Sequence, residues 1–269
     1  MAEQHQSSSG QSAAEVRKQI SENGLMPLLE HLGELRRRIF YSLLVLVIGL
    51  GIGLYFAKPL YLFVIEDGPM NGVDLHTFSL WDGIGMYMKF AFLIALVLVL
   101  PFVFFQLWAF IKPALSVQEQ RATLKYIPFT LLLFLMGLSF AYFVIAPMAF
   151  EFTTSVSRSL GLIETYGVMQ YISFLLNLLL PISLLFELPL VIMFLTKLRI
   201  LNPIRLRKMR KIAYFVMILI GTVITPPDVI SDILVSIPLL ILYEASIYLS
   251  GTVYKKQLAA DAKWERESA

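Results

Sequence analysis

The apolar stretch Ile39–Phe56, with the sequence IFYSLLVLVIGLGIGLYF, directly follows the polar segment His31–Arg38, with the sequence HLGELRRR. An uncharged run of this length is typical of a helix that crosses a bilayer. Basic residues ahead of such a run also resemble a secretion signal, but those signals end in a cleavage site with small residues. Here the run leads into Ala57-Lys58-Pro59 instead. We therefore expect Ile39–Phe56 to be retained as the first membrane span.

The composition of the whole chain also indicates a membrane protein. Of its 269 residues, 58% are hydrophobic and 15% are charged, and the mean hydropathy is +0.74, whereas soluble domains have about 45–50% apolar and about 25% charged residues. The chain has no cysteine, which excludes disulfides, thiolate metal sites and thiol catalysis, and its three histidines lie far apart. We expect no metal and no cofactor. The net charge of +3 comes from short clusters between apolar runs, which indicates membrane topology rather than nucleic-acid binding.

The apolar runs predict an all-α polytopic membrane protein with six transmembrane helices. Each run is bounded by charged residues or by proline and glycine, as expected for successive spans. The six predicted spans are Ile39–Phe56, Phe90–Ile111, Tyr126–Phe150, Met169–Leu195, Ile212–Ile224 and Val229–Leu249.

Basic residues lie almost entirely on one set of the connecting segments. Of the 22 lysines and arginines, 19 precede the first run, follow the last, or lie between the second and third and between the fourth and fifth. The positive-inside rule therefore places both termini in the cytoplasm. Residues 1–24 are rich in serine, glutamine and glutamate, so we expect a disordered cytoplasmic tail. Residues 25–251 then form the membrane domain, and residues 252–269 form a second cytoplasmic tail.

The fifth run, Ile212–Ile224, is unusually short. Thirteen helical residues rise about 20 Å, against a hydrocarbon core of about 30 Å. Pro226-Pro227 removes two backbone donors, so the chain must turn there before Asp228 and the sixth run. We expect the fifth and sixth spans to be short. Two explanations stay open, a re-entrant-like hairpin inside the bundle and a bilayer that thins around it.

One carboxylate, Glu187, lies inside the fourth run, in the sequence LLFELP. It precedes Lys197 by a helical rise of about 15 Å, so it lies within the hydrocarbon. Ionisable residues at this depth are costly and usually face a cavity or a partner. Pro181 and Pro189 predict kinks that curve this span around a groove. We assign Glu187 and Gln106, a second buried polar residue, to this intramembrane groove. The alternatives are that Glu187 is a protonated side chain bonded to a neighbouring helix and that Gln106 serves only to join two helices by hydrogen bonds.

Two carboxylates are expected at the cytoplasmic edge of the membrane. Residues 27–39 predict a short amphipathic helix in the membrane interface, and Glu34 and Arg38 are four residues apart on its polar face. This spacing by itself indicates no more than an internal ion pair. Glu119, in the next cytoplasmic segment, supplies a second acidic side chain on the same side. Its apolar neighbours are Phe110 and Leu115. A pair of carboxylates beside an apolar surface favours a cationic peptide that contains arginine and an apolar segment.

Several separated motifs resemble the TatC family, the polytopic receptor of the twin-arginine protein translocase. The resemblance extends from Met26 to Leu249. It rests on the ordered set His31–Arg38, Gln106–Leu115, Phe140–Phe143, Phe186–Pro189 and Thr225–Val229.

The resemblance implies a role for each motif. Glu34 and Glu119 match the family's acidic residues that receive the paired arginines of a folded cargo's signal peptide. Glu187 matches an intramembrane glutamate that faces a concave groove, and Asp228 matches the acidic tip of the short hairpin. The remaining matched positions are Arg36, Arg38 and Phe110 on the recognition surface, and Pro226, Pro227 and Asp232 in the hairpin where partners dock.

The resemblance also implies the setting in which the chain works. Members of the family lie in the bacterial cytoplasmic (inner) membrane and assemble with small single-span subunits, TatA-like and TatB-like, in an oligomeric complex. They use the protonmotive force, hydrolyse no nucleotide and have no catalytic residues. Membrane lipids are further partners.

Two rival functions remain on the residues alone. The first is a proton-coupled secondary transporter with a relay of Glu187, Asp232 and Glu244, although the two halves of the chain show no evident repeat. The second is a purely structural scaffold, for which none of these carboxylates is needed.

Overall fold

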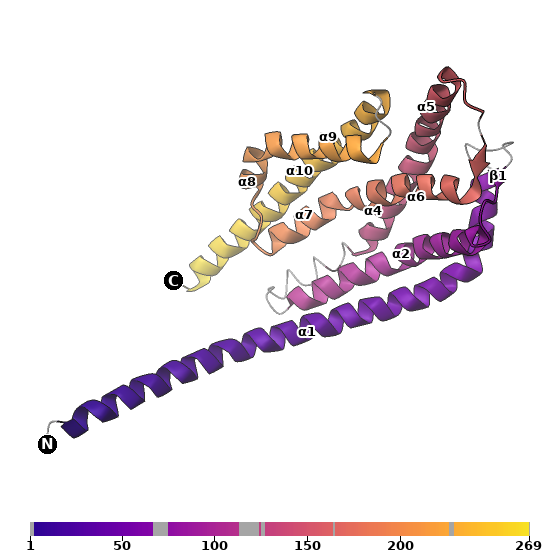
Figure 1. Cartoon of the computed structure of the whole chain (residues 1–269). Helices are drawn as coiled ribbons and strands as arrows, with labels where there is room; N and C mark the ends of the chain where they lie inside the picture. The colour runs from indigo at the N-terminus through magenta and orange to yellow at the C-terminus, as the bar shows by residue number, and fades with distance from the viewer. Residues whose placement is uncertain are drawn as a thin grey trace.

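A computed structural model of the chain describes residues 3–66, 75–112, 124, 127–163, 165–225 and 229–268. Helices dominate this part of the chain, as predicted, and they lie in a loose bundle with both termini at one end (Figure 1). In chain order the elements are α1 (Glu3–Glu66), β1 (Leu75–His76), α2 (Asp82–Ile111), α4 (Ile127–Phe140), the π-helix η2 (Ala141–Ile145), α5 (Ala146–Ser159), β2 (Tyr166–Gly167), α6 (Val168–Leu185), α7 (Leu188–Lys197), α8 (Pro203–Lys208), α9 (Arg210–Ile224) and α10 (Val229–Ser268).

Five helical segments of the described chain are long and apolar enough to cross a membrane. They are Gly33–Glu66, Asp82–Ile111, Ile127–Ser159, Val168–Lys197 and Asp232–Ala259. Each overlaps one of the predicted spans. The other predicted span is α9, whose 15 residues rise about 22 Å. The fifth helix is therefore short, as expected.

Helix α10 is longer than the sequence suggested. It runs for 40 residues, and its segment Asp232–Ala259, with 28 residues, is long and apolar enough to cross a membrane. The expected short length of the sixth span within the membrane stays a prediction. The helix also passes through the boundary at residue 252 without a break. The residues after Leu249 include alanine, lysine, glutamine and glutamate, which have high helix propensity and contain no proline.

Helix α1 is likewise continuous. Its backbone is helical from Glu3, and no turn separates residues 27–39 from the first span. The amphipathic segment is therefore the lower part of one long helix rather than a separate interfacial helix. The expected disordered tail, residues 1–24, stays a prediction. Good helix formers such as alanine, glutamate, glutamine and lysine recur in this segment, and low hydrophobicity alone does not prevent a helix.

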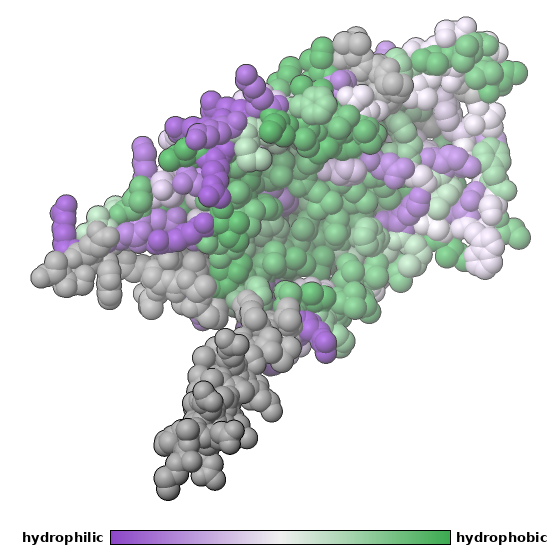
Figure 2. All heavy atoms as spheres, turned by 60° about the vertical axis from the view of Figure 1, so that its left-hand side comes forward, coloured by the Kyte–Doolittle hydropathy of each residue, from purple (hydrophilic) through white to green (hydrophobic). Residues whose placement is uncertain are grey.

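The centre of the bundle is α6. Four of its side chains are at most 2% exposed, those of Ile172, Leu175, Leu178 and Ile182. A much larger share of the apolar residues is buried in α6–α7 than in α1. Helix α1 is therefore peripheral and packs mainly along α2. A broad hydrophobic band crosses the surface, and hydrophilic residues gather at its two ends (Figure 2). This zoning is the pattern of a protein that spans a membrane.

The fourth span breaks where the proline pattern predicted a kink. Helix α6 ends at Leu185 and α7 begins at Leu188, with Pro189 in its first turn. Because proline lacks an N–H, the hydrogen bond that would continue α6 through this point cannot form. Glu187 lies at the break itself.

The end of the bundle opposite to the termini is closed by short backbone contacts. Strands β1 and β2 pair in parallel, with Leu75 opposite Tyr166. At the start of α2 the buried Asp82 carboxylate accepts hydrogen bonds from the backbone N–H groups of Phe78 at 2.9 Å and Ser79 at 3.0 Å. These two bonds stabilise the turn that leads into α2.

Candidate functional site

Glu34, Arg38 and Gln106 form a polar cluster where α1 and α2 meet, towards the end of the bundle that carries the termini. The Arg38 guanidinium donates from Nε to Glu34 Oε1 at 3.2 Å, from Nη2 to the same oxygen, and from Nη1 to Gln106 Oε1 at 3.3 Å. The Glu34 side chain is 37% exposed and that of Arg38 is 20% exposed. We call these three residues the Glu34 cluster. Glu34 is thus an accessible carboxylate that already holds one guanidinium.

The cluster contains the predicted ion pair and a bond between two helices. The Glu34–Arg38 ion pair predicted from the four-residue spacing is present. Gln106 bonds to α1 across the helix–helix contact, and its expected place in an intramembrane groove stays a prediction. Because Glu34 on α1 and Gln106 on α2 accept from different N–H groups of the guanidinium, the Arg38 side chain is fixed by both helices.

The other predicted recognition residues surround this cluster only in part. Arg36 and Arg37 are exposed, and Arg37 donates from Nε to the Tyr41 hydroxyl at 2.8 Å and lies 5.4 Å from the centre of its ring. Phe110 is half-buried in the last turn of α2. Glu119 and Leu115 lie outside the described residues, so their expected place beside Glu34 stays a prediction.

Small residues allow α1 and α2 to approach closely, further along α1 from the Glu34 cluster. A Cβ added at Gly53 would lie 2.3 Å from the Ala91 carbonyl oxygen, and one added at Gly49 would lie 3.2 Å from Ala95 Cα. Gly49 and Gly53 on α1 therefore face Ala91 and Ala95 on α2, both pairs spaced by four residues. This is the small-xxx-small pattern of tightly packed membrane helices. The glycine spacing was visible in the sequence but was not used to pair these two helices.

Glu187 is buried inside the bundle. Its residue is 3% exposed, and neither carboxylate oxygen has a hydrogen-bond partner within the described residues. Beside it, the Phe186 ring packs 5.7 Å from that of Phe140, and a Cβ added at Gly137 would lie 2.7 Å from Ser183 Cα. Helix α4 therefore presses closely on α6 just before the break. The carboxyl group of Glu187 is thus buried in this structure, and its expected position facing a groove stays a prediction.

The hairpin of α9 and α10 carries a second polar contact. The Thr222 hydroxyl donates to Asp232 Oδ1 at 3.1 Å, and the Ser236 hydroxyl lies 3.5 Å from the same oxygen. The Thr222 bond joins the last turn of α9 to the first turns of α10, whereas the Ser236 contact lies within α10. Gly221 lies opposite, because a Cβ there would approach both Asp232 and Ser236 at 3.2 Å. The hairpin tip itself, Pro226-Pro227-Asp228, lies outside the described residues.

At the other end of α9, an ion pair and a hydrogen bond join it to α10. Arg210 donates from Nη2 to Glu244 Oε2 at 2.6 Å, and the Tyr214 hydroxyl donates to Glu244 Oε1. Sequence reasoning named Glu244 but missed both partners, since they lie on another helix 30 and 34 residues away. No hydrogen bond among the described residues connects Glu187, Asp232 and Glu244 to one another.

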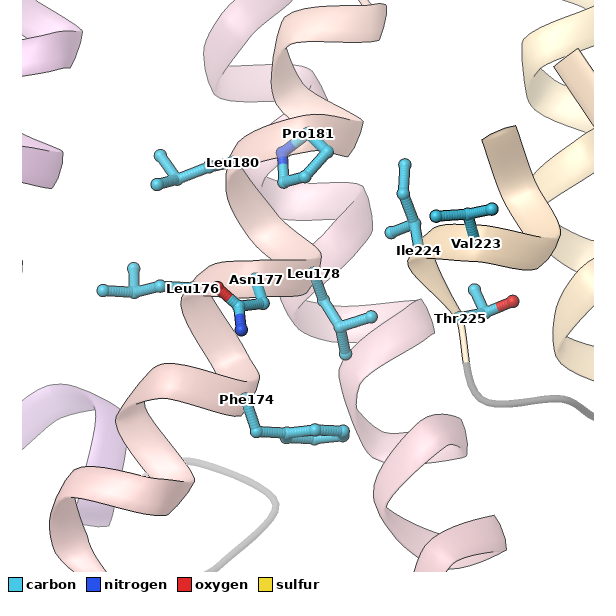
Figure 3. Close-up of a pocket in the computed structure, with 9 residues that line it drawn as sticks. All are labelled: Phe174, Leu176, Asn177, Leu178, Leu180, Pro181, Val223, Ile224 and Thr225. Carbon is cyan, nitrogen blue, oxygen red and sulfur yellow. The ribbon is translucent and has the colours of Figure 1, made fainter. Parts of the chain in front are cut away.

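A groove of about 650 Å³ opens between α6 and the end of α9. Figure 3 shows Asn177 and Thr225 as its polar side chains among apolar ones, with the α6 residues on one wall and Val223 and Ile224 on the other. Its lining residues are Phe174, Leu176, Asn177, Leu178, Leu180, Pro181, Val223, Ile224 and Thr225. Glu187 does not line it, so the groove and the buried carboxyl group are separate features.

Comparison with known proteins decides the family. Residues 30–238 match the family model described as Sec-independent protein translocase protein (TatC). The chain belongs to the TatC family. This TatC-family chain is 42% identical to TatCy of Bacillus subtilis over 88% of its own length and 93% of the relative's. It is 32% identical to TatC of Escherichia coli over 86% of its own length and 90% of the relative's.

The fold agrees with solved TatC structures. A crystal structure of the twin-arginine translocase receptor TatC superposes with a TM-score of 0.68 and 34% identity, over 83% of this chain and 99% of that one. A second, in DDM, gives a TM-score of 0.71 and 35% identity over 82% and 99%. The TatC-family chain is therefore a multi-pass membrane component of a Sec-independent, twin-arginine protein translocase, which is a multi-subunit assembly. The Glu34 cluster, Glu187 and Asp232 all lie inside the matched residues.

Proposed function

We propose that this protein is the receptor core of the translocase and that it binds the twin-arginine signal peptides of folded cargo proteins at the Glu34 cluster. The proposal rests on the exposure and the hydrogen bonds of the Glu34 carboxylate. Its carboxylate is accessible, lies at the end of an apolar helix surface and already accepts two hydrogen bonds from a guanidinium. It therefore offers the acceptor geometry that an incoming arginine needs.

Binding then takes the form of an exchange. An arginine of the signal peptide replaces Arg38 on Glu34, and Arg38 keeps its bond to Gln106. Since one guanidinium is traded for another, the carboxylate does not become unpaired at any stage, which avoids the cost of an isolated charge near the membrane. A lysine fits this exchange less well, because an ammonium group cannot donate two parallel bonds to a carboxylate.

The second arginine of the pair requires a second acceptor. We assign this role to Glu119, whose segment follows α2 and therefore begins beside Phe110 at the same end of the bundle. Arg36 and Arg38 border the site, and Phe110 and Leu115 supply apolar contacts for the residues next to the arginine pair.

The apolar part of the signal peptide needs an apolar surface that leads away from Glu34. Helix α1 supplies one, because Ile39, Phe40, Leu43 and Val47 are between 55% and 61% exposed. Glu187 acts deeper in the membrane. We propose that movement at the α6–α7 break uncovers its carboxyl group towards the groove when a signal peptide inserts, which gives this costly buried group a use.

The remaining features support assembly with other subunits. We propose that TatA-like and TatB-like single-span subunits dock along α9 and α10, close to Pro226, Pro227, Asp228 and Asp232. If α9 is counted with the five long helices, the chain has six spans, and the charge distribution supports cytoplasmic termini in a bacterial inner membrane. Transport then draws on the protonmotive force and requires no catalytic residue, nucleotide or cofactor in this chain.

A secondary transporter is the weaker candidate. A proton relay needs its carboxylates within hydrogen-bond reach of one another or of common partners, whereas Asp232 bonds to Thr222 and Glu244 bonds to Arg210 and Tyr214. No specific observation favours the relay.

A photoreactive signal peptide tests the proposal in native membranes. With the reactive group next to the arginine pair, we expect adducts to the lower part of α1 around Glu34 and to the end of α2 around Phe110. The matched control is the same peptide with two lysines, which should give far fewer adducts. Adducts confined to the β1–β2 end of the bundle would contradict the proposal.

A further inference from the structure

The segment between α7 and α9 carries an exposed basic patch. Four side chains, Arg205, Arg207, Lys208 and Lys211, are exposed, and none lies within ion-pair distance of a carboxylate in the described part of the chain. We call these four residues the basic patch. The other two arginines nearby are neutralised, because Arg199 pairs with Asp261 at 2.7 Å and Arg210 pairs with Glu244. The patch therefore contributes four positive charges within seven residues.

The patch is held in place by the last helix. Asn202 caps α8 by accepting a hydrogen bond from the Ile204 N–H at 2.9 Å, and the Tyr243 hydroxyl of α10 donates to the Leu206 carbonyl at 3.0 Å. Pro203 and Leu206 form the buried face of α8. The exposed basic side chains of α8 therefore extend from a fixed support.

Large apolar side chains are exposed among these charges. Ile204 is 54% exposed, Met209 50% and Ile212 62%. The segment begins where the membrane-spanning α6–α7 segment ends at Lys197 and runs into α9, so it lies at the edge of the hydrophobic band. A mixture of basic and exposed apolar side chains at that depth fits the boundary between lipid headgroups and acyl chains.

From this juxtaposition we infer that the basic patch binds the phosphate headgroups of anionic phospholipids, with Ile204, Met209 and Ile212 in the adjoining acyl region. An acidic protein segment would satisfy the charges but would leave these apolar side chains in water, so lipid is the better occupant. The inference goes beyond signal-peptide capture and requires only that α7 and α10 cross the membrane. It assigns a lipid requirement to one short segment of the chain.

The absence of cysteine makes a direct test possible. In the full chain, Ile204→Cys introduces a single thiol for a fluorescent label. The labelled protein is placed in bilayers that contain the same fraction of either brominated phosphatidylglycerol or brominated phosphatidylcholine, and quenching is compared. The ratio of the two quenching constants measures how strongly the anionic lipid is enriched at the patch.

The charge variants come in a matched pair. Arg207→Gln with Lys208→Gln removes two charges from the patch, whereas Lys255→Gln with Lys256→Gln removes two exposed charges from α10 at the same end of the bundle. We expect a quenching ratio well above one in the parent, which falls by about fivefold per removed patch charge until it reaches one. The α10 variant should keep the parent's ratio. Quenching by phosphatidylcholine should be the same in all three proteins, which shows that each remains folded with the label in lipid.

Three results would overturn the inference. They are a ratio of one in the parent, an equal loss in both double variants, and loss of the enrichment when inorganic phosphate is added at constant ionic strength. The last result would assign the patch to a free anion rather than a lipid. Binding of an Arg-Arg signal peptide is measured on the same proteins, and it should not change in the patch variant. A failure of this inference is therefore distinguishable from a failure of signal-peptide capture.

Discussion

The contact between Gly53 and Ala91 predicts that Gly53→Ala will separate α1 from α2. The added Cβ would lie 2.3 Å from the Ala91 carbonyl oxygen and 2.8 Å from its Cα. These are backbone atoms of a helix, so they cannot turn aside as a flexible side chain can. The helices must move apart by about 0.5–1 Å, a gap that forfeits about a quarter to a half of the dispersion energy of the contact. Overpacking of this kind costs about 1–3 kcal/mol.

Two neighbouring glycines provide matched controls. A Cβ at Gly51 meets nothing within 4 Å, and one at Gly49 lies 3.2 Å from Ala95 Cα. All three substitutions gain about 1 kcal/mol of helix propensity. We therefore expect Gly51→Ala to be neutral or stabilising and Gly49→Ala to lie in between. Gly53→Ala should be less stable than Gly51→Ala by about 1–3 kcal/mol.

The free energy of unfolding of the three variants can be compared by titration with a denaturing detergent in mixed micelles. Because α1 has few buried side chains outside its contact with α2, the loss should appear first in α1. The same displacement moves Arg38 away from Gln106, so Gly53→Ala should also weaken binding of the signal peptide. Equal stability of Gly53→Ala and Gly51→Ala would refute the close approach of the two helices.

Three further substitutions test separate parts of the structure. Glu187→Leu removes two buried carboxylate oxygens without described partners. It should raise the free energy of unfolding by about 1–3 kcal/mol and abolish export of cargo. A lower free energy of unfolding would show that the carboxyl group is hydrogen-bonded. Asp82→Ala removes the acceptor of two backbone N–H groups and should lower the thermal unfolding midpoint, at a cost of about 1–3 kcal/mol, whereas Asp82→Asn keeps one acceptor oxygen and should cost less. Gln106→Leu removes a single interhelical hydrogen bond and should cost less than about 1 kcal/mol, so a larger loss in the same titration would point to a further role for this amide.

The sequence was most informative for features that depend on one segment alone, namely the positions of the spans and of the helix break. Runs of apolar residues located the five long spans, and the short run before Pro226-Pro227 gave the length of α9, because hydrophobic length depends only on local composition. Pro189 likewise predicted the break beside Glu187, since proline acts on its own backbone. The length of helix α10 could not be predicted from its apolar run, because a helix continues beyond such a run when good helix formers follow.

Contacts between distant segments could not be predicted in this way. The bond from Arg38 to Gln106 joins residues 68 positions apart, and nothing in either segment specifies the register of α1 against α2. The close approach at Gly53 fixes that register, but it depends on which face of α2 presents Ala91. The close approach of Gly137 to Ser183 and Phe186 likewise joins distant segments and has no local sequence pattern.

The central claim is that Glu34 exchanges Arg38 for an arginine of the signal peptide. The direct measurement is the affinity of an Arg-Arg peptide and of its Lys-Lys version for the parent chain, Glu34→Ala, Glu119→Ala and the control Glu66→Ala, an exposed carboxylate at the other end of α1. We predict that the parent and the control prefer the Arg-Arg peptide by about tenfold, as expected for a bidentate pair, and that both other variants lose affinity and preference. Equal affinity in all combinations would contradict the claim.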